Sequence, residues 1–194
     1  MGKIFYLMGK SSSGKDTIFK ELKKRMPFLH TVTIYTTRPM RENERDGEEY
    51  FFVDDKVLDV FQKENRVIEL REYHTVHGIW KYFTADDGKI QLEYQDYLMI
   101  GTLESFEKMC GYFGKEKIIP IYVEVEDGER LFRALSRERM QEKPKYAEMC
   151  RRFLADTEDF CEENLSRCGV QRRFQNIVLE DCLNEIMLYI QNCL

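Results

Sequence analysis

The sequence predicts an α/β fold with a central, mainly parallel sheet flanked by helices. Short apolar, β-prone runs alternate along the chain with longer stretches whose apolar residues recur at helical spacing, as in strands joined by helical crossovers. The chain has 194 residues, of which 43% are hydrophobic, so it can bury a sizeable core as a single domain.

The first strand and the first helix are the best-marked elements. Residues 3–8 are apolar and β-prone, and Ile18, Phe19, Leu22 and Met26 follow at helical spacing. Later apolar runs predict strands at residues 32–35, 50–53, 67–70, 97–100, 118–123 and 176–179. Amphipathic patterns predict helices at residues 54–64, 103–113, 127–141, 145–164 and 181–193.

A phosphate-binding pattern lies between that strand and that helix. Residues 9–17 read Gly-Lys-Ser-Ser-Ser-Gly-Lys-Asp-Thr and fit G-x-x-x-x-G-K. Glycines let the backbone curl around a phosphate so that N–H groups point at the anion, and the lysine would reach the β- and γ-phosphates. The alternative is an ordinary glycine- and serine-rich turn. We predict an ATP site made by Gly9, Lys10, Ser11, Ser12, Ser13, Gly14, Lys15, Asp16 and Thr17.

Asp16 departs from the usual pattern, which has a hydroxyl residue there to ligate Mg²⁺. A carboxylate is a hard oxygen donor that can hold Mg²⁺ directly or through water, but its charge also repels the phosphates. Thr17 would then supply the hydroxyl contact, so Asp16 and Thr17 are the candidate metal ligands. Alternatively, Asp16 only stabilises the helix dipole from the first turn.

Two stretches interrupt the alternation of strands and helices. Residues 38–49 are charged and turn-rich, and residues 130–152 are a pair of arginine-rich helical segments separated near Lys143-Pro144. We expect inserted subdomains over about residues 34–96 and 127–155. One would hold a phosphate acceptor and the other would close over the donor, because phosphoryl transfer requires that water be excluded.

Composition argues against several other classes of protein. Thirty basic and 35 acidic side chains give a net charge of −5, which does not favour nucleic acid or an anionic membrane as a partner. The six cysteines form no C-x-x-C pair, and we interpret them as reduced thiols of a cytoplasmic protein, with a metal site as the alternative. The first residues fit neither a cleavable signal nor a myristoylation pattern, and no apolar run is long enough to span a membrane. We assign no protein partner.

Residues 36–53 are the next most specific feature and read T-T-R-P-M-R-E-N-E-R-D-G-E-E-Y-F-F-V. With the phosphate loop, this segment resembles the guanylate kinase family, in which T-T-R-x-x-R-x-x-E, a glycine and Y-F-V form the site for GMP. The resemblance implies that Arg38, Arg41 and Tyr50 hold the GMP phosphate and that Glu44 is the acidic residue of the same region. Guanidinium groups suit this task because their planar fork grips phosphate oxygens bidentately. The alternative is a solvated charged loop.

Two later segments continue the resemblance. Val67-Ile-Glu-Leu-Arg is similar to the family strand whose glutamate recognises guanine, which implies that role for Glu69. Tyr82-Phe-Thr resembles the family's Y-G-T and implies that Tyr82 contacts the phosphate and Thr84 the base. Phe83 replaces the family glycine, and residues 73–81 form a stretch about three residues longer than usual. The alternative for Glu69 is an exposed position on an alternating strand.

The arginine-rich helices resemble the family lid. Arg137-Glu-Arg139 is similar to the lid sequence R-x-R, and Arg152 to a later lid arginine, which implies that these side chains stabilise the transferring phosphoryl group. Arg139 would contact ATP. A solvated face of ion pairs is the alternative, because arginines and glutamates gather here at helical spacing: Arg130, Arg133 and Arg137 beside Glu129 and Glu138.

The resemblance fails at several positions. Ile100 and Thr102 stand where the family strand has two acids, one of which contacts guanine while the other lies near the metal. Ile34 replaces a serine, and the late asparagine that helps to frame adenine is not found around Leu179-Glu180. These departures weaken the implied selectivity for purines.

Taken with the motifs, the resemblance implies a P-loop kinase fold and a kinase that transfers the γ-phosphoryl group of ATP to GMP with Mg²⁺. The implied catalytic residues are Lys15, Arg38, Arg137 and Arg152. Two alternatives stay open. Ribose 1,5-bisphosphate phosphokinase also has Gly-Lys-Asp in its loop and lacks the acidic strand end, and a non-catalytic guanylate-kinase-like module would only bind, although such modules often lose the loop that this chain keeps.

Overall fold

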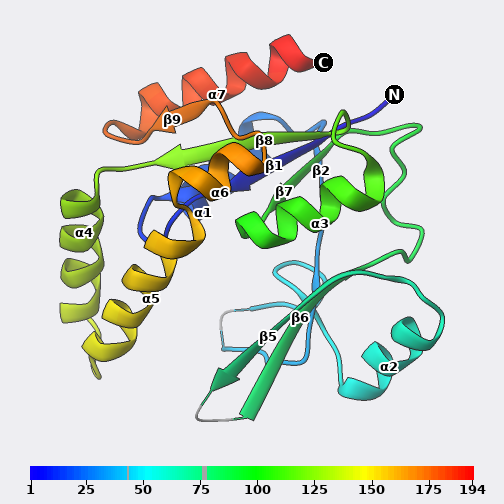
Figure 1. Ribbon diagram of the computed structural model, residues 1–194, viewed down its shortest axis with the longest axis horizontal. Coiled ribbons are helices and arrows are strands. Elements are labelled where there is room, and N and C mark those ends of the chain that lie inside the picture. Colours follow the sequence, from blue (N-terminus) through cyan, green and yellow to red (C-terminus); the bar gives the residue numbers. More distant parts are fainter. Residues whose placement is uncertain (43, 76–77) are drawn as a thin grey trace.

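The computed structural model describes residues 1–42, 44–75 and 78–194 (Figure 1). Within them, five parallel strands form the core sheet in the order β2-β7-β1-β8-β9. The central strand β1 (Ile4–Met8) pairs with β7 (Tyr97–Ile100) and β8 (Ile118–Glu124), while β2 (His30–Thr31) and β9 (Arg173–Gln175) lie at the edges. The predicted α/β fold with a mainly parallel central sheet is confirmed.

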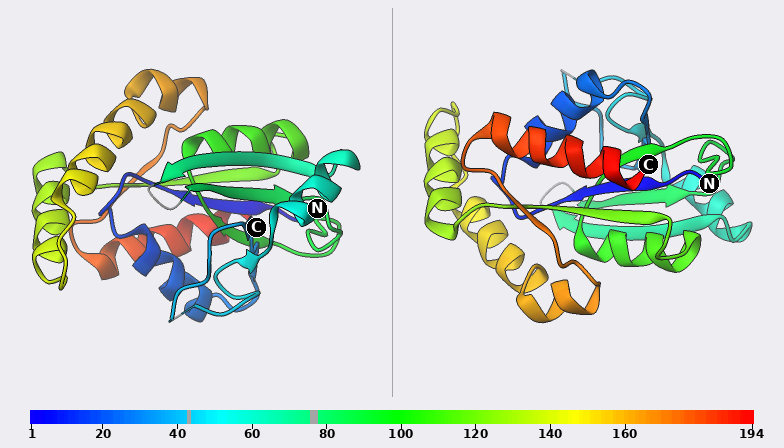
Figure 2. Two further views of the ribbon diagram at one scale, coloured as in Figure 1. Left: turned by 90° about the horizontal axis from the view of Figure 1, so that it is seen from below. Right: turned by 90° about the horizontal axis from the view of Figure 1, so that it is seen from above.

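Helices cover both faces of this sheet, so all five residues of β1 are fully buried. Phe5 and Leu7 belong to the core cluster that includes residues of α1 (Lys15–Arg25) and α7 (Leu179–Cys193). The alternate residues of β1 face the other layer, which contains α3 (Leu103–Phe113) and α6 (Glu162–Arg167) (Figure 2). The carboxyl end of β1 thus delivers the phosphate loop directly from a rigid core.

A smaller second sheet follows the first helix and lies below the core in Figure 1. Its strand order is β4-β3-β6-β5, with β5 antiparallel to β6. A separate apolar cluster of Tyr35, Leu58, Phe83 and Ala85 holds it together with α2. The elements are β3 (Tyr35–Thr36), β4 (Phe51–Phe52), α2 (Asp55–Lys63), β5 (Val67–Thr75) and β6 (Gly78–Ala85). They occupy the predicted insert of residues 34–96, whose boundaries stay a prediction.

The second predicted insert contains two helices beyond the carboxyl end of β8. α4 (Asp127–Arg139) and α5 (Tyr146–Asp159) pack against each other at the left of Figure 1. Arg130, Ala134 and Glu138 of α4 are buried, whereas α5 has no fully buried residue. No helix of the described residues is long and apolar enough to cross a membrane.

Several predicted boundaries are wrong. The strand expected at residues 176–179 is β9 at Arg173–Gln175, and α7 already begins at Leu179. The helix expected over residues 145–164 breaks into α5 and α6, because the chain turns at Phe160 to bury that ring against Tyr122, with centroids 5.5 Å apart. The strand expected at residues 32–35 is mostly the connection between β2 and β3, because only Tyr35 lies in a strand. β6 is not predicted at all, because its pairing with β5 is not apparent from periodicity.

Candidate functional site

The phosphate loop runs from Gly9 to Gly14 and leads into α1. Gly14 has a φ of 87°, and a Cβ there would lie 2.3 Å from the Asn176 Nδ2. A Cβ at Gly9 would lie 2.5 Å from the Val123 carbonyl oxygen. Both positions therefore require glycine, the first for conformation as well as space. Gly14 also precedes α1 without a side chain to cap it, so the first-turn N–H groups remain available to an anion.

Lys15 is the first residue of α1 and is half-buried. Burial lowers the pKa of its ammonium group, the carboxylates of Asp16 and Asp156 oppose this, and Arg152 and Arg137 lower the pKa further. The net effect is a cation whose charged form is disfavoured where it lies. An anion bound at the loop would therefore be stabilised strongly by this group.

Asn176 is a contact of the loop that the sequence reasoning missed. It follows β9, is buried, and its Nδ2 donates to the Ser13 carbonyl oxygen at 2.8 Å. The family asparagine is expected around Leu179-Glu180, but those residues form the first turn of α7. The signal that could have found Asn176 is a single amide residue directly after an edge strand of the parallel sheet.

The lid helices touch the loop through arginines. The Nη2 of Arg137 donates to the Ser12 Oγ at 3.3 Å, and the Nη2 of Arg152 donates to the Ser11 Oγ at 3.1 Å. Both guanidinium groups are exposed apart from these contacts. The structure thus brings together two lid arginines, Lys15 and the loop, which come from α4, α5 and α1. Arg139 ends α4 and is exposed.

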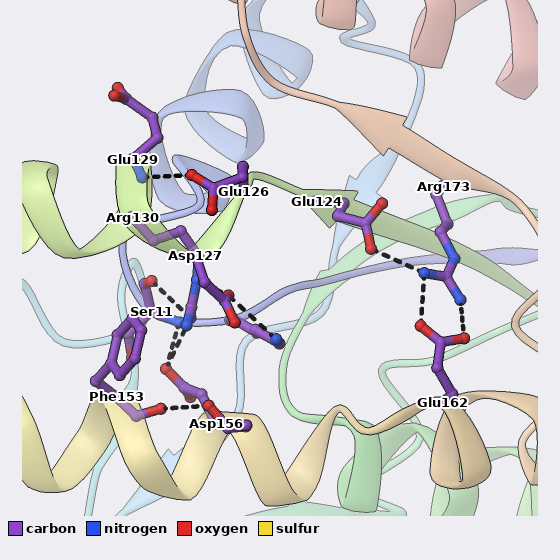
Figure 3. Close-up of polar contacts among 12 residues, drawn as sticks. Ser11, Glu124, Glu126, Asp127, Glu129, Arg130, Phe153, Asp156, Glu162 and Arg173 are labelled. Carbon is purple, nitrogen blue, oxygen red and sulfur yellow. Dashed lines mark hydrogen bonds and ion pairs between the residues drawn. The ribbon is translucent and has the colours of Figure 1, made fainter.

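Arg130 of α4 connects the two lid helices, α4 and α5, to the phosphate loop (Figure 3). Its side chain is fully buried; its Nε donates to Asp127 at 3.0 Å, its Nη1 donates to the Ser11 carbonyl oxygen at 3.4 Å, and it pairs with Asp156 at 3.5 Å. Asp156 in turn accepts the Ser11 N–H at 2.7 Å. The guanidinium also lies 4.6 Å from the centre of the Phe153 ring. For this arginine, the alternative of a solvated ion-pair face is wrong.

The acceptor segment forms a compact polar cluster around Arg38, which is buried. Arg38 makes a bidentate ion pair with Glu44, with N–O distances of 2.9 and 2.7 Å, and its Nε donates to the Tyr82 Oη at 3.1 Å. The Tyr50 ring lies 5.3 Å below the guanidinium. Arg41 is exposed, although its backbone N–H also donates to Glu44 at 2.9 Å. Three of the predicted phosphate contacts, Arg38, Tyr50 and Tyr82, therefore lie together, and for Arg38 a solvated loop is wrong.

Glu69 lies in a second polar cluster on the same sheet. Only 2% of it is exposed, so the alternative of an exposed strand position is wrong. It accepts from the Thr84 hydroxyl at 2.9 Å, as expected from their predicted proximity, and from the Arg71 guanidinium at 2.9 and 3.1 Å. Arg71, which sequence reasoning did not select, could have been found by its i, i+2 spacing from Glu69 on a strand.

The remaining positions are those that depart from the family pattern, Ile100, Thr102 and Asp16, together with the candidate metal ligand Thr17. Thr102 caps α3, because its hydroxyl accepts the Ser105 N–H at 3.2 Å, and Ile100 packs against the α1 and α7 side of the core. Asp16 and Thr17 are exposed in the first turn of α1. The tip of the long stretch at residues 73–81 lies partly outside the described residues, at 76–77.

We expect Arg38→Ala to lower the free energy of unfolding by about 3 kcal/mol, because it leaves the Glu44 carboxylate without its buried partner. Arg38 holds the pKa of Glu44 below its usual value of 4.5. The stabilisation is therefore present above pH 4.5 and is lost as the pH falls through the lowered pKa. Urea unfolding at pH 7 and at pH 3 measures both effects. Arg45→Ala, at an exposed ion pair, is the control, and an equal loss in both variants would contradict the assignment.

Comparisons with known proteins agree with this arrangement. The family model described as guanylate kinase matches residues 1–79, which contain the phosphate loop and the acceptor segment. The guanylate kinase of Thermobifida fusca (strain YX) is 42% identical over 37% of this chain and 36% of its own length. That of Parasynechococcus marenigrum (strain WH8102) is 25% identical over 98% of this chain and 97% of its own length.

The structural comparison agrees over the whole fold. The crystal structure of guanylate kinase from Anaplasma phagocytophilum superposes with a TM-score of 0.62 and 18% identity, covering 98% of this chain and 86% of that one. The chain spans little more than a third of the length of the first relatives it matches, 36% and 39% for the Thermobifida fusca and Tropheryma whipplei (strain Twist) proteins. The chain is thus similar in sequence to guanylate kinases, most clearly over residues 1–79, and it has the fold of a solved guanylate kinase.

Proposed function

We propose that the chain is an ATP-dependent kinase that transfers the γ-phosphoryl group to the phosphate of GMP. The observation that carries the proposal is the contact of Arg137 and Arg152 with the phosphate loop that leads into Lys15, whose pKa burial lowers. Three cations and an uncapped helix N-terminus form a site suited to a triphosphate. The Arg38 cluster on the second sheet supplies a separate place for an acceptor phosphate.

The proposed chemistry requires no general base. An oxygen of the ionised acceptor phosphate forms a new bond to the γ-phosphorus, while the bond between that phosphorus and the β–γ bridging oxygen breaks and ADP leaves with the electron pair. The protein positions the two substrates and neutralises charge. In this scheme Lys15 and the loop N–H groups hold ATP, Arg38 with Arg41 and Tyr50 holds the acceptor, and the lid arginines Arg137, Arg139 and Arg152 face the transferring group.

Mg²⁺ is the proposed cofactor. The Asp16 carboxylate and the Thr17 hydroxyl lie beside Lys15 at the N-terminus of α1, and two oxygen donors suit a cation that is held mainly by phosphates and water. Among the described residues no cluster of three or more His, Cys, Asp or Glu side chains could bind a metal by itself. When bound with ATP, Mg²⁺ would neutralise phosphate charge. ATP as the donor also fits the cytoplasm as the proposed location.

One observation favours a second candidate, a kinase for a small sugar phosphate such as ribose 1,5-bisphosphate. Glu69, the implied guanine contact, is already paired with Arg71, and the acids expected near the base are Ile100 and Thr102. With Glu69 already occupied by Arg71 and no acid at positions 100 and 102, the site suits an anionic group better than the N–H edge of guanine. A non-catalytic binding module is disfavoured by the intact loop and lid contacts.

An assay of ADP release in the presence of GMP, AMP, dGMP, IMP, UMP or ribose 1,5-bisphosphate tests the proposal. We expect the highest kcat/KM with a guanine or closely related purine monophosphate. Turnover confined to the sugar bisphosphate would show that the second candidate is correct. ATP binding without transfer to any of these acceptors would instead identify a binding module.

A further inference from the structure

On the second sheet, Arg71 of β5 lies beside Glu69, the residue implied to contact the base. Residues at alternate positions of a strand share a face, so Glu69, Arg71 and Tyr73 of β5 point the same way. In the antiparallel register, Glu69 lies opposite Thr84 and Arg71 opposite Tyr82 of β6. Tyr82 is the residue that bonds to Arg38. Arg71 therefore lies between the predicted base contacts and the predicted phosphate contacts.

Arg71 uses only one edge of its guanidinium to hold Glu69. Its Nε donates to the Glu69 Oε2 at 2.9 Å and its Nη2 donates to the Oε1 at 3.1 Å. Both side chains are almost completely buried, with 8% and 0% of the side chains exposed, and the pairing with Glu69 raises the pKa of Arg71 despite burial. A guanidinium has five N–H donors. The edge formed by Nη1 and the second N–H of Nη2 makes no hydrogen bond to any of the described residues.

In Glu69, by contrast, nearly all of the hydrogen-bond acceptor positions of the carboxylate are occupied. Its Oε1 accepts from Arg71 and from the Thr84 hydroxyl, and its Oε2 accepts from Arg71. A carboxylate offers about four acceptor positions, so Glu69 has room for a single further donor. It cannot accept from both N1–H and the 2-amino group of guanine while this pair stays intact.

Among the residues that the structure describes, Glu69 is the carboxylate that pairs with Arg71. The charge of Arg71 acts on the buried phenol of Tyr6, and a Cβ at Gly101 would lie 2.0 Å from the Tyr6 Oη. Arg71 is thus close to the end of β7, where Ile100 and Thr102 flank Gly101. Neither of these side chains carries a negative charge that could pair with the guanidinium, so the free edge is suited to a neutral or anionic hydrogen-bond acceptor of a ligand.

We propose that Arg71 determines the base specificity of the acceptor site by donating from its free edge to O6 and N7 of a 6-oxopurine. An arginine fork matches these two acceptors, whereas adenine presents an N6 amino donor at the position of O6. Glu69 accepts the one remaining N–H, from N1. The site therefore selects a 6-oxopurine monophosphate over a 6-aminopurine and does not depend on the 2-amino group. This inference rests on the part of the proposed function that places a nucleoside monophosphate in the acceptor site.

The test compares GMP, IMP, AMP and ribose 1,5-bisphosphate as acceptors, by kcat/KM with ATP and by calorimetric binding without ATP. For the wild type we expect IMP within about threefold of GMP and AMP weaker by about tenfold to a hundredfold. Arg71→Lys keeps a charge for Glu69 but loses the planar fork. It should lower kcat/KM for GMP and IMP by about tenfold and leave the value for AMP unchanged.

Two further variants complete the design. Glu69→Gln/Arg71→Met removes both charges together, so it avoids an unpaired buried carboxylate, and it should also abolish the preference for GMP over AMP. Arg66→Lys, at an exposed ion pair outside the cluster, should leave the preference intact. A wild type that requires the 2-amino group, a GMP-to-AMP ratio that Arg71→Lys does not change, or binding of the sugar bisphosphate alone would overturn the inference. Selective binding without transfer would instead refute the proposed kinase activity and leave the inference standing.

Discussion

Lys15→Met is expected to lower kcat for phosphoryl transfer by about a hundredfold to a thousandfold, the effect of removing one preorganised charge from a transition state. Lys15 begins α1 where the loop N–H groups converge, and its aliphatic stem is replaced by one of similar volume. The substitution therefore removes the ammonium group with little change in packing. Initial rates at saturating ATP, together with the KM for the acceptor, measure the loss.

The same variant should be at least as stable as the wild type. Burial lowers the pKa of Lys15, so the charged group opposes folding below that lowered pKa. As the pH rises through the lowered pKa toward the usual value of 10.5, the ammonium group loses its proton in the folded state first and its cost disappears. The stability advantage of Lys15→Met over the wild type is thus full below the lowered pKa and vanishes above pH 10.5.

A loss of kcat without a loss of stability would show that the charge of Lys15 serves catalysis and not the fold. Lys24→Met, at an exposed ion pair on the same helix, is the matched control and should leave both activity and stability within error. A Lys15→Met protein that unfolds more easily than the wild type and keeps its kcat would show that the lysine is structural. Thermal unfolding at pH 7 and pH 10 in parallel with the rate assay decides between these outcomes.

The sequence predicts the loop and its flanking elements well because they are local. A buried central strand, two required glycines and an amphipathic helix occupy residues 4–25 without a gap, so periodicity and spacing are sufficient to locate them. The segment from Arg38 to Tyr50 is also contiguous, and its ion pair joins residues six positions apart.

The missed residues depend on contacts between distant parts of the chain. Asn176 reaches the loop over 163 positions, and the Ser11–Asp156 hydrogen bond spans 145. In the sequence, Arg130 is one of several arginines on a charged helix, and its burial follows only from the tertiary fold. Arg71 is only two positions from Glu69 on one strand, so spacing can suggest the pair, but only the structure shows that both carboxylate oxygens are occupied.

Arg130→Met is the second substitution for which we expect a large effect, because Arg130 joins the lid to the loop (Figure 3). Its loss leaves the mostly buried Asp156 carboxylate without its ion-pair partner and removes a donor to the Ser11 carbonyl oxygen. We expect the free energy of unfolding to fall by about 3 kcal/mol, at the lower end for a broken buried pair because the other partner, Asp127, is half exposed.

The same substitution should lower kcat by about a hundredfold, since Arg137 and Arg152 would no longer be held against the loop and small displacements of positioned groups are costly. Arg151→Met, at an exposed pair on α5, is the control and should change neither quantity appreciably. Urea unfolding and initial rates measure the two effects.

A double substitution separates stability from positioning. Arg130→Met/Asp156→Leu removes both members of the buried pair, so it should recover most of the lost stability, as apolar replacements of buried ion pairs often do. It also removes the acceptor of the Ser11 N–H, so the lid would still lack its attachment to the loop and kcat should stay low. If kcat recovered together with stability, the cluster would serve only to stabilise the fold; if kcat stays low while stability recovers, Arg130 and Asp156 position the lid arginines for transfer.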